Sequence, residues 1–152
     1  MVKYCVLLIM CLFLSSCGDS HARHQLLSHS LDNMLYVPGG TYNMGMGDGT
    51  PTTVTSFYVD KYNTSYGEYD LYTAATWQKK TDSDDLTLSR GKNYPADELT
   101  WYQAHDYCAY LAKKTGLPFS LSTEAQWEYV ARNNGKKHWD FPTNNGKLQP
   151  GI

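Results

Sequence analysis

Residues 117–132 read Leu-Pro-Phe-Ser-Leu-Ser-Thr-Glu-Ala-Gln-Trp-Glu-Tyr-Val-Ala-Arg, and they carry the strongest structural signal in the chain. Phe119 and Leu121 alternate with serines, which predicts a short half-buried strand. Thr123 then begins a helix, because Gln126 follows three residues later and the two side chains can satisfy each other's free backbone N–H groups as a capping box.

The helix that begins at Thr123 is expected to bury one apolar stripe. Trp127, Val130 and Ala131 lie at i, i+3 and i+4, so they share one side of a helix. Glu124 falls in the first turn, where the helix dipole favours a carboxylate. The Asn-Asn-Gly at residues 133–135 predicts a left-handed exit from the helix.

This stretch resembles the Arg-Leu-Pro-Thr-Glu-Ala-Glu-Trp-Glu-Tyr-Ala-Ala-Arg signature of the formylglycine-generating enzyme family, also called sulfatase-modifying factor domains. Ser120 stands where the family has Arg, Ser122 where it has Pro, and Gln126 where it has Glu. Over the whole chain we assign a structural role to eight family-signature positions, namely Trp101, Tyr107, Cys108, Thr123, Glu124, Trp127, Glu128 and Arg132.

Two strands are expected at the start of the family-like region. Residues 34–37 predict the first, which ends at a Pro-Gly-Gly, and residues 41–45 return as the second. This order is similar to the family's opening, with Tyr42 in place of a Phe. The glycine-rich residues 45–49 lack the spacing of a phosphate-binding loop, so we interpret them as a surface loop.

The middle of the chain predicts one further strand and two further helices. The β-branched and aromatic residues 52–59 indicate a strand. Ser65 with Glu68 forms one capping box, for a helix that runs to about Thr76, and Thr100 with Gln103 forms another. The buried sides are expected to hold Tyr69, Tyr72 and Thr76 in the first helix and Ala104, Tyr107, Cys108 and Leu111 in the second, which closes with Lys113, Lys114 and Gly116.

The resemblance implies an α+β fold, irregular and C-type-lectin-like, truncated to the first half to two-thirds of a usual family domain. In active members of the family, copper held by two cysteines oxidises a substrate cysteine to formylglycine. The matching copper and calcium ligands are expected beyond the end of this chain, so the resemblance implies no cofactor and no catalytic or metal-binding residue within it.

The N-terminus predicts export and a lipid anchor. Lys3 precedes the uninterrupted apolar residues 6–14, which are too short for a mature membrane span. Residues 14–17, Leu-Ser-Ser-Cys, resemble the lipobox of bacterial lipoproteins, in which the cysteine becomes the lipidated N-terminus. We therefore expect lipid attachment at Cys17 and location in the cell envelope, at the outer membrane or the periplasmic face. The alternative is an ordinary cleaved signal peptide.

The expected organisation is a signal peptide over residues 1–16, a polar tether over 17–33 and a partial sulfatase-modifying-factor-like domain over 34–152. The histidines of the tether lack a fixed backbone or carboxylate frame, so a solvated linker is preferred to a metal site. The acidic residues 82–85 lack the glycine and distal glutamate of an EF-hand loop. Cys108 is either a small buried apolar residue or an intermolecular thiol, and His105 is a surface residue beside Asp106.

Composition excludes some classes of function. The formal net charge is −2 and no basic stripe is present, so nucleic acid is not an expected partner. Partners are instead the membrane, through the lipid, and a protein. A copper site needs paired soft thiolates, which the mature sequence does not supply.

Three hypotheses follow from these observations. The first is a membrane-anchored lipoprotein whose domain binds or scaffolds without catalysis. The alternative is a truncated product of a full-length family member that oxidises protein cysteine to formylglycine or performs a related metal-dependent oxidation. The third is a copper- or iron-dependent oxidase in this form.

Overall fold

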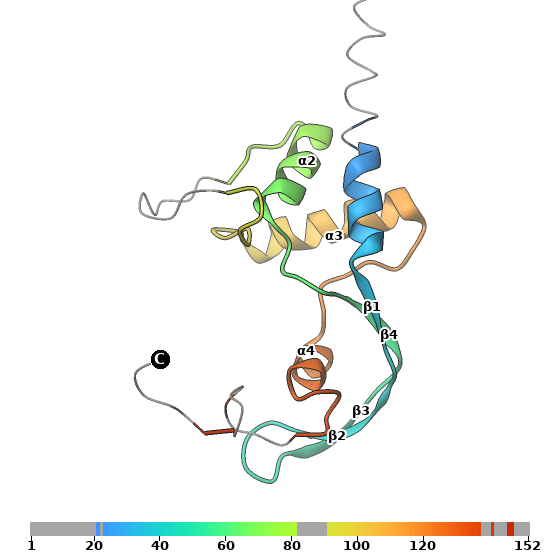
Figure 1. Ribbon diagram of the computed structural model, residues 1–152, viewed down its shortest axis with the longest axis vertical. Coiled ribbons are helices and arrows are strands. Elements are labelled where there is room, and N and C mark those ends of the chain that lie inside the picture. Colours follow the sequence, from blue (N-terminus) through green and yellow to red (C-terminus); the bar gives the residue numbers. More distant parts are fainter. Residues whose placement is uncertain (1–20, 22, 82–90, 138–140, 142–145, 148–152) are drawn as a thin grey trace, which may run out of the picture. The chain divides into compact units, whose positions relative to one another are not determined.

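The computed structural model describes residues 21, 23–81, 91–137, 141 and 146–147 (Figure 1). These residues form two compact units. Unit 1 contains the described residues up to Asn33 together with Tyr62–Ser120, and unit 2 contains Met34–Lys61 and the described residues from Leu121 onward. Cys17, the expected signal peptide over residues 1–16 and the acidic residues 82–85 lie outside the described residues. Within the described part of the chain, no helix is long and apolar enough to cross a membrane.

Unit 2 is built on four short antiparallel strands. They are β1 Met34–Val37, β2 Gly40–Met44, β3 Thr50–Val54 and β4 Phe57–Asp60. Strand β1 pairs with β4, with Tyr36 opposite Tyr58, and β2 pairs with β3, with Tyr42 opposite Thr52. The two strands predicted at the start of the domain are therefore confirmed.

The single strand predicted over residues 52–59 is instead two strands, because the chain bends between Val54 and Phe57. The opposing strand bends at Pro38 and Gly39. At Gly39 a side-chain Cβ would lie 2.6 Å from Val54 O and 2.7 Å from Ser56 N, so only glycine allows the two bends to approach.

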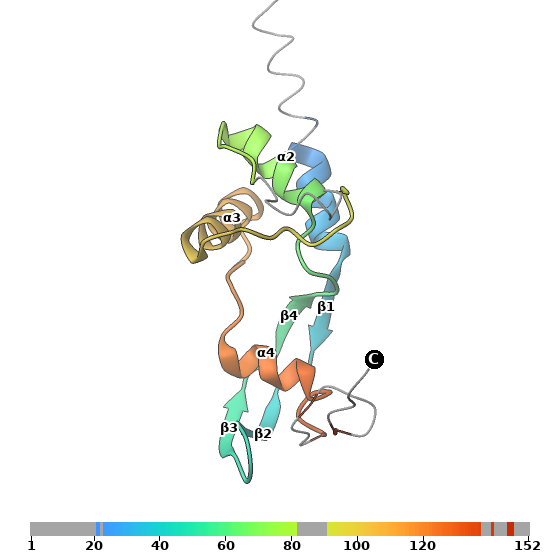
Figure 2. The ribbon, with the colours of Figure 1, turned by 90° about the vertical axis from the view of Figure 1, so that its left-hand side faces the viewer.

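The helix α4, Glu124–Ala131, packs against β2 and β3 in unit 2 (Figure 2). Its capping box is confirmed, since Thr123 Oγ1 accepts the N–H of Gln126 at 3.2 Å and Gln126 Oε1 accepts the N–H of Thr123 at 2.9 Å. The expected apolar stripe is confirmed at Val130, which is half-buried against the core of unit 2, and is wrong for its other two residues. Trp127 and Ala131 are exposed, and Tyr129 is the buried residue.

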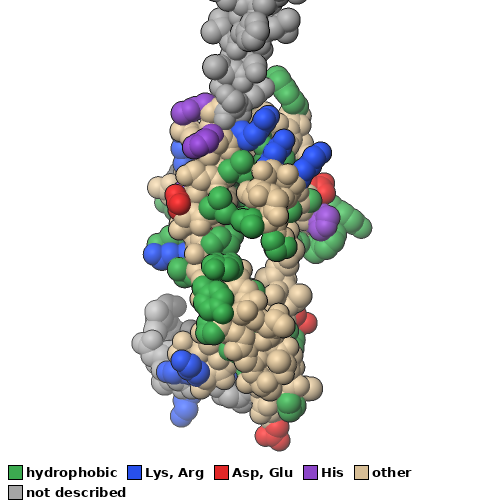
Figure 3. All heavy atoms as spheres, turned by 90° about the vertical axis from the view of Figure 1, so that its right-hand side faces the viewer, with side chains coloured by type: hydrophobic (Ala, Val, Ile, Leu, Met, Phe, Trp, Pro, Cys, Tyr) green, Lys and Arg blue, Asp and Glu red, His purple; other side chains and the backbone are tan. Residues whose placement is uncertain are grey.

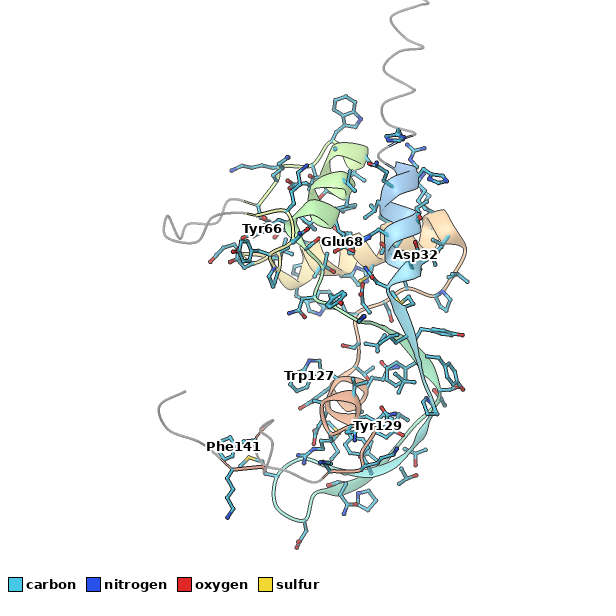
Figure 4. All side chains as sticks on the ribbon, viewed as in Figure 1. Asp32, Tyr66, Glu68, Trp127, Tyr129 and Phe141 are labelled. Carbon is cyan, nitrogen blue, oxygen red and sulfur yellow. The ribbon has the colours of Figure 1, made fainter. Side chains whose placement is uncertain are left out.

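The orientation of α4 explains this correction. The helix faces the strands with its Ala125 and Tyr129 side, because Tyr42 on β2 donates its hydroxyl to the Ala125 carbonyl at 2.9 Å. Figure 4 shows Tyr129 directed toward the strands and Trp127 on the opposite side of the helix. The core of unit 2 consists of Val37, Tyr42, Val54 and Tyr129.

Unit 1 is helical. Residues 23–32 form a helix, followed in this unit by α2, Tyr66–Thr76, and α3, Trp101–Thr115. Both predicted capping boxes are present, and α3 ends at Gly116 in the left-handed region after Lys113 and Lys114, as expected. The buried core residues of this unit are Leu26, Tyr69, Tyr72, Tyr107 and Leu111.

The helix at residues 23–32 differs from the polar tether expected over residues 17–33. Leu26 and Ser30 lie one turn apart and are almost fully buried, so this face of the segment belongs to the core of unit 1. The sequence of this segment is rich in histidine and serine, and its buried stripe has only two residues, so its hydrophobic pattern does not predict a buried helix.

A second difference concerns the strand expected around Phe119 and Leu121. Both residues are half-buried and alternate with exposed serines, but the segment pairs with no strand in the described part of the chain and is irregular. The alternation of apolar and polar residues therefore indicates that one side of the segment is buried, but the segment is not a strand of a sheet.

Candidate functional site

An ion pair at the C-terminal end of α4 fixes this helix to the β2–β3 loop. Its two side chains also hydrogen-bond to the backbone N–H and C=O of Gly45. Arg132 Nε donates to Glu128 Oε1 at 2.6 Å, and both side chains are largely buried, at 12% and 15% exposure. The same Glu128 oxygen accepts the N–H of Gly45 at 2.8 Å, while Arg132 donates to the Gly45 carbonyl at 2.8 Å. We call these three residues the Gly45 clamp.

Two tyrosines complete the junction between α4 and the strands. The rings of Tyr42 and Tyr129 pack with their centroids 5.3 Å apart, and Tyr129 donates its hydroxyl to the Pro38 carbonyl at 3.2 Å. Tyr129 Oη occupies the space beside Gly40, where a Cβ would lie only 2.6 Å away. Burial is the main cause that raises the pKa of Tyr42, so its hydroxyl stays protonated and able to donate.

The signature residues of α4 therefore support the fold. Glu128 and Arg132 clamp a loop, Thr123 caps the helix and Glu124 lies in its first turn. Thr123, Glu124 and Trp127 are exposed, and the Trp127 side chain, at 66% exposure, has no structural contact of this kind among the described residues. Thr123, Glu124, Glu128 and Arg132 each have a structural contact or position. The structural role expected of Trp127, and of the exposed Trp101 on α3, remains a prediction.

In unit 1, the first turn of α3 carries a cluster of exposed rings. Trp101 is 62% exposed and Tyr102 75%. The Trp101 ring stacks on His105 with centroids 5.1 Å apart and planes 21° apart, and meets Tyr102 edge to face at 5.4 Å. His105 Nδ1 lies 3.4 Å from Asp106 Oδ1. We call Trp101, Tyr102 and His105 the ring platform.

The ring platform has the chemistry of a contact surface. Exposed, mutually supported aromatic rings lose little conformational entropy on binding and offer flat apolar area. Figure 3 shows exposed hydrophobic side chains beside a histidine at the edge of the displayed face. The i, i+4 spacing of Trp101 and His105 is the sequence signal for the stack, although the expectation for His105 is only that of a surface residue.

The remaining two signature residues of unit 1 lie further along α3. Tyr107 is buried and packs against Tyr72 with ring centroids 5.4 Å apart. Cys108 is half-buried against the same core, and burial raises the pKa of its thiol. A protonated, half-buried thiol is a poor nucleophile and a poor metal ligand.

The described side chains do not supply the donors of the family's copper site. Cys108 is the one thiol that the structure describes, and no three histidine, cysteine or carboxylate side chains of the described residues are grouped so that they could hold a metal ion. A two-thiolate copper centre does not fit these donors.

The sequence comparison decides the family. The family described as "Sulfatase-modifying factor enzyme 1-like domain" matches residues 21–151. The chain belongs to this family. The match includes residues 23–32, in agreement with the burial of Leu26 in unit 1.

Two relatives are similar to most of this chain, and the first carries the name of the family's enzyme. The chain is 24% identical over 175 aligned residues to the formylglycine-generating enzyme of Mus musculus, covering 80% of this chain and 45% of the relative. It is 23% identical over 137 residues to the serine/threonine-protein kinase Pkn1 of Chlamydia trachomatis serovar L2, covering 74% of this chain and 21% of the relative.

A solved structure is also similar. PvdO from Pseudomonas aeruginosa matches with a TM-score of 0.60 and 28% identity, covering 76% of this chain and 52% of that chain. The expected α+β fold of the formylglycine-generating enzyme type is therefore confirmed. The chain spans about half the length of the mouse enzyme and of PvdO.

Proposed function

We propose that this sulfatase-modifying-factor-like domain acts as a binding or scaffolding module, held at a membrane of the cell envelope by a lipid on Cys17. The single observation that supports binding most directly is the ring platform, which presents Trp101, Tyr102 and His105 on the surface of α3. The partner is a protein surface with apolar or guanidinium side chains, which pack well on exposed indole and phenol rings.

The lipid anchor is supported by the N-terminal sequence. A basic residue, an apolar stretch and Leu-Ser-Ser-Cys at residues 14–17 occur in the order that lipoprotein processing requires. Several acyl chains on one cysteine would hold the domain stably at a bilayer, whereas a single chain would bind only marginally. The domain then needs no membrane-spanning helix.

The anchor is tested by expressing the full chain in a bacterium and analysing the N-terminal peptide by mass spectrometry. The expected peptide begins at Cys17 and carries diacylglycerol and an N-acyl chain. The Cys17→Ala chain is expected to leave the membrane fraction. An unmodified mature protein in the soluble fraction would instead support an ordinary cleaved signal peptide.

The binding surface is tested by site-specific photo-crosslinking in intact cells. A photoreactive residue in place of Tyr102 is expected to trap one discrete protein, and the trapped amount should fall at least about fivefold when Trp101→Ala is added, as expected for loss of an aromatic hot spot. Trp77 is 86% exposed and stacks on no other ring in the described contacts, so it provides a matched control position. Equal crosslinking at Trp77 and Tyr102 would contradict the proposal.

The second candidate function is cysteine oxidation by a longer protein that contains this sequence. It is favoured by length, since the chain aligns with 45% of the mouse formylglycine-generating enzyme and 52% of PvdO. The reading frame beyond codon 152 and the mass of the natural product test this candidate. If the natural product is longer, assay of that product with a cysteine peptide should yield an aldehyde; a product of this length that yields none excludes the candidate.

A further inference from the structure

The capping boxes of α2, α3 and α4 differ in the charge of the residue at the third helical position, and α2 has Ser65 where the other two have a threonine. Helices α3 and α4 use Gln103 and Gln126 at the third helical position, whereas α2 uses Glu68. A glutamine amide is sufficient to accept the N–H of the capping residue, so the cap does not require a charge. Glu68 is moreover a buried residue, where a carboxylate costs more than an amide unless it has a partner.

The two oxygens of Glu68 have different surroundings. Oε2 makes the cap, since it accepts the N–H of Ser65 at 2.7 Å and its hydroxyl at 2.8 Å. Oε1 lies 3.6 Å from Nε2 of His29, on the helix at residues 23–32. The Glu68 side chain is 8% exposed and that of His29 is 57% exposed, so the carboxylate is covered while the imidazole can exchange protons with solvent. In Figure 4, Glu68 lies on the side of α2 that faces this helix, near the labelled Asp32.

The His29 nitrogen has a second neighbour of opposite character. Asn33 Nδ2 lies 3.2 Å from the same Nε2. An amide NH₂ can only donate and a carboxylate can only accept, so the two neighbours suit different protonation states of one atom. Neutral His29 in the Nδ1–H tautomer, which contact with the Asn33 amide favours over the Nε2–H tautomer, has a free Nε2 lone pair that accepts from Asn33. Protonated His29 carries a hydrogen on Nε2. The ring must then direct this N–H away from the Asn33 amide and toward Glu68.

We propose that His29 is a pH-dependent latch, which ties the helix at residues 23–32 to α2 through Glu68 when His29 is protonated. Histidine is the side chain that ordinarily changes charge between about pH 5 and 8. The attachment is therefore strongest at acid pH and weakens as the pH rises. Leu26 keeps the helix in the core in both states, so the latch changes how often the helix detaches, not where it docks.

The other charged and titratable groups around His29 are few in the described part of unit 1. His24 and Asp32 of the same helix line the shallow hollow beside it, together with Gln25, Ser28 and Leu71. Asp32 Oδ2 accepts from Ser28 at 3.5 Å, and on α2 Asp70 is paired with Lys80 at 3.0 Å. Glu68 is thus the carboxylate within ion-pair distance of His29.

The test is hydrogen exchange of the full chain at about pH 5 and about pH 8, with each amide expressed as a protection factor so that the intrinsic pH dependence of exchange cancels. Protection of residues 23–32 is expected to be about threefold higher at acid pH, the size of effect of a partly exposed ion pair. His29→Gln should remove this difference. His24→Gln, a matched change on the same helix, should retain it.

Glu68→Gln is the second variant, because the other two capping boxes show that glutamine preserves the cap. It is expected to remove the pH difference at residues 23–32 while leaving the protection of α2 unchanged. Equal wild-type protection at both pH values would overturn the proposal. So would a pH difference that persists in His29→Gln or Glu68→Gln, or one that disappears in His24→Gln.

The position of the latch gives it a consequence that depends on the proposed function. If Cys17 is lipidated, the helix at residues 23–32 is the first described element after the anchor, and the latch adjusts how closely unit 1 is held to it. Repeating the exchange experiment with Cys17→Ala separates the two proposals. The pH difference should persist in that variant, and its loss would show that the latch requires the anchor.

Discussion

The ring cluster of unit 1 and the tyrosine pair of unit 2 differ in the surroundings of their hydroxyls, although Tyr66, elsewhere in unit 1, donates its hydroxyl to Asp97. In unit 1, Tyr69, Tyr72 and Tyr107 form a cluster of rings with centroids 5.4–6.0 Å apart, and the buried Tyr69 hydroxyl has no hydrogen-bond partner among the described residues. In unit 2, Tyr42 and Tyr129 also pack ring to ring, but each hydroxyl donates to a backbone carbonyl.

This difference shows two contributions of a buried tyrosine: its ring fills core volume, and its hydroxyl can fix the position of a neighbouring segment. Rings in unit 1 contribute buried apolar area and ring contacts, and such contributions do not depend strongly on one partner atom. Hydroxyls in unit 2 join α4 and the β1–β2 bend to particular atoms, and the Gly45 clamp adds an ion pair to the same junction. The free energy of unfolding should therefore respond most to loss of volume around Tyr69 in unit 1, and to loss of single polar atoms at the α4 junction of unit 2.

The largest effect is expected from Tyr72→Ala in the ring cluster. Removing a buried aromatic side chain leaves a cavity, and the free energy of unfolding should fall by about 3–5 kcal/mol. Urea denaturation followed by fluorescence measures the change. Tyr102→Ala removes the same side chain from an exposed position on α3 and should change stability by less than about 0.5 kcal/mol. Similar losses in both variants would show that the cluster does not form the core of unit 1.

The next effect concerns the Gly45 clamp in unit 2. Arg132→Met keeps much of the side-chain volume but leaves Glu128 charged, largely buried and without its cation, so stability should fall by about 3 kcal/mol. Lys136→Met, an exposed cation of the same unit, should cost less than about 0.5 kcal/mol. Combining Arg132→Met with Glu128→Gln should recover part of the loss. Additive losses in the double variant would contradict a coupled pair.

A smaller effect is expected from alkaline pH on both units. Burial raises the pKa values of Tyr69 and Tyr72 in unit 1 and of Tyr42 in unit 2 above the ordinary value of 10.0. The folded chain then holds more protons than the unfolded chain, so stability is retained below about pH 10 and falls as the pH rises above it. Thermal melts from pH 8 to 11 measure this fall. Tyr69→Phe should reduce its slope, and an unchanged slope would indicate that this tyrosine does not contribute.

Tyr42→Phe tests whether a single hydroxyl group contributes to the stability of unit 2. The change removes the donor to the Ala125 carbonyl and keeps the ring, so the free energy of unfolding should fall by about 1 kcal/mol. Denaturant unfolding measures the fall, and hydrogen exchange should place it at α4. If stability does not fall, the packing of the rings, and not the Tyr42 hydrogen bond, holds α4 on the strands of unit 2.

The smallest effect is expected from Tyr69→Phe in unit 1. Its hydroxyl is buried without a hydrogen-bond partner in the described structure, so its removal should change stability by less than about 0.5 kcal/mol at neutral pH, or increase it slightly. The same unfolding experiment tests this variant. A loss as large as that of Tyr42→Phe would reveal a partner for the hydroxyl and remove the contrast between the units.

The sequence by itself determined the local structure. All three capping boxes, the left-handed end of α3 and the first two strands follow from residues within one or two turns of each other, because capping and turn chemistry act over that distance. The signature around Trp127 also indicates the family from the sequence alone, because its residues are contiguous and need no knowledge of distant contacts.

Tertiary structure decided which sides of these elements are buried and what the polar residues contact. It turned α4 so that Tyr129, not Trp127, faces the strands, and it brought Gly45 to Glu128 and Arg132 across more than eighty residues. It also placed Leu26 in a core and His29 beside Glu68. Such contacts depend on packing between distant segments, and neither periodicity nor composition encodes the partner of a residue.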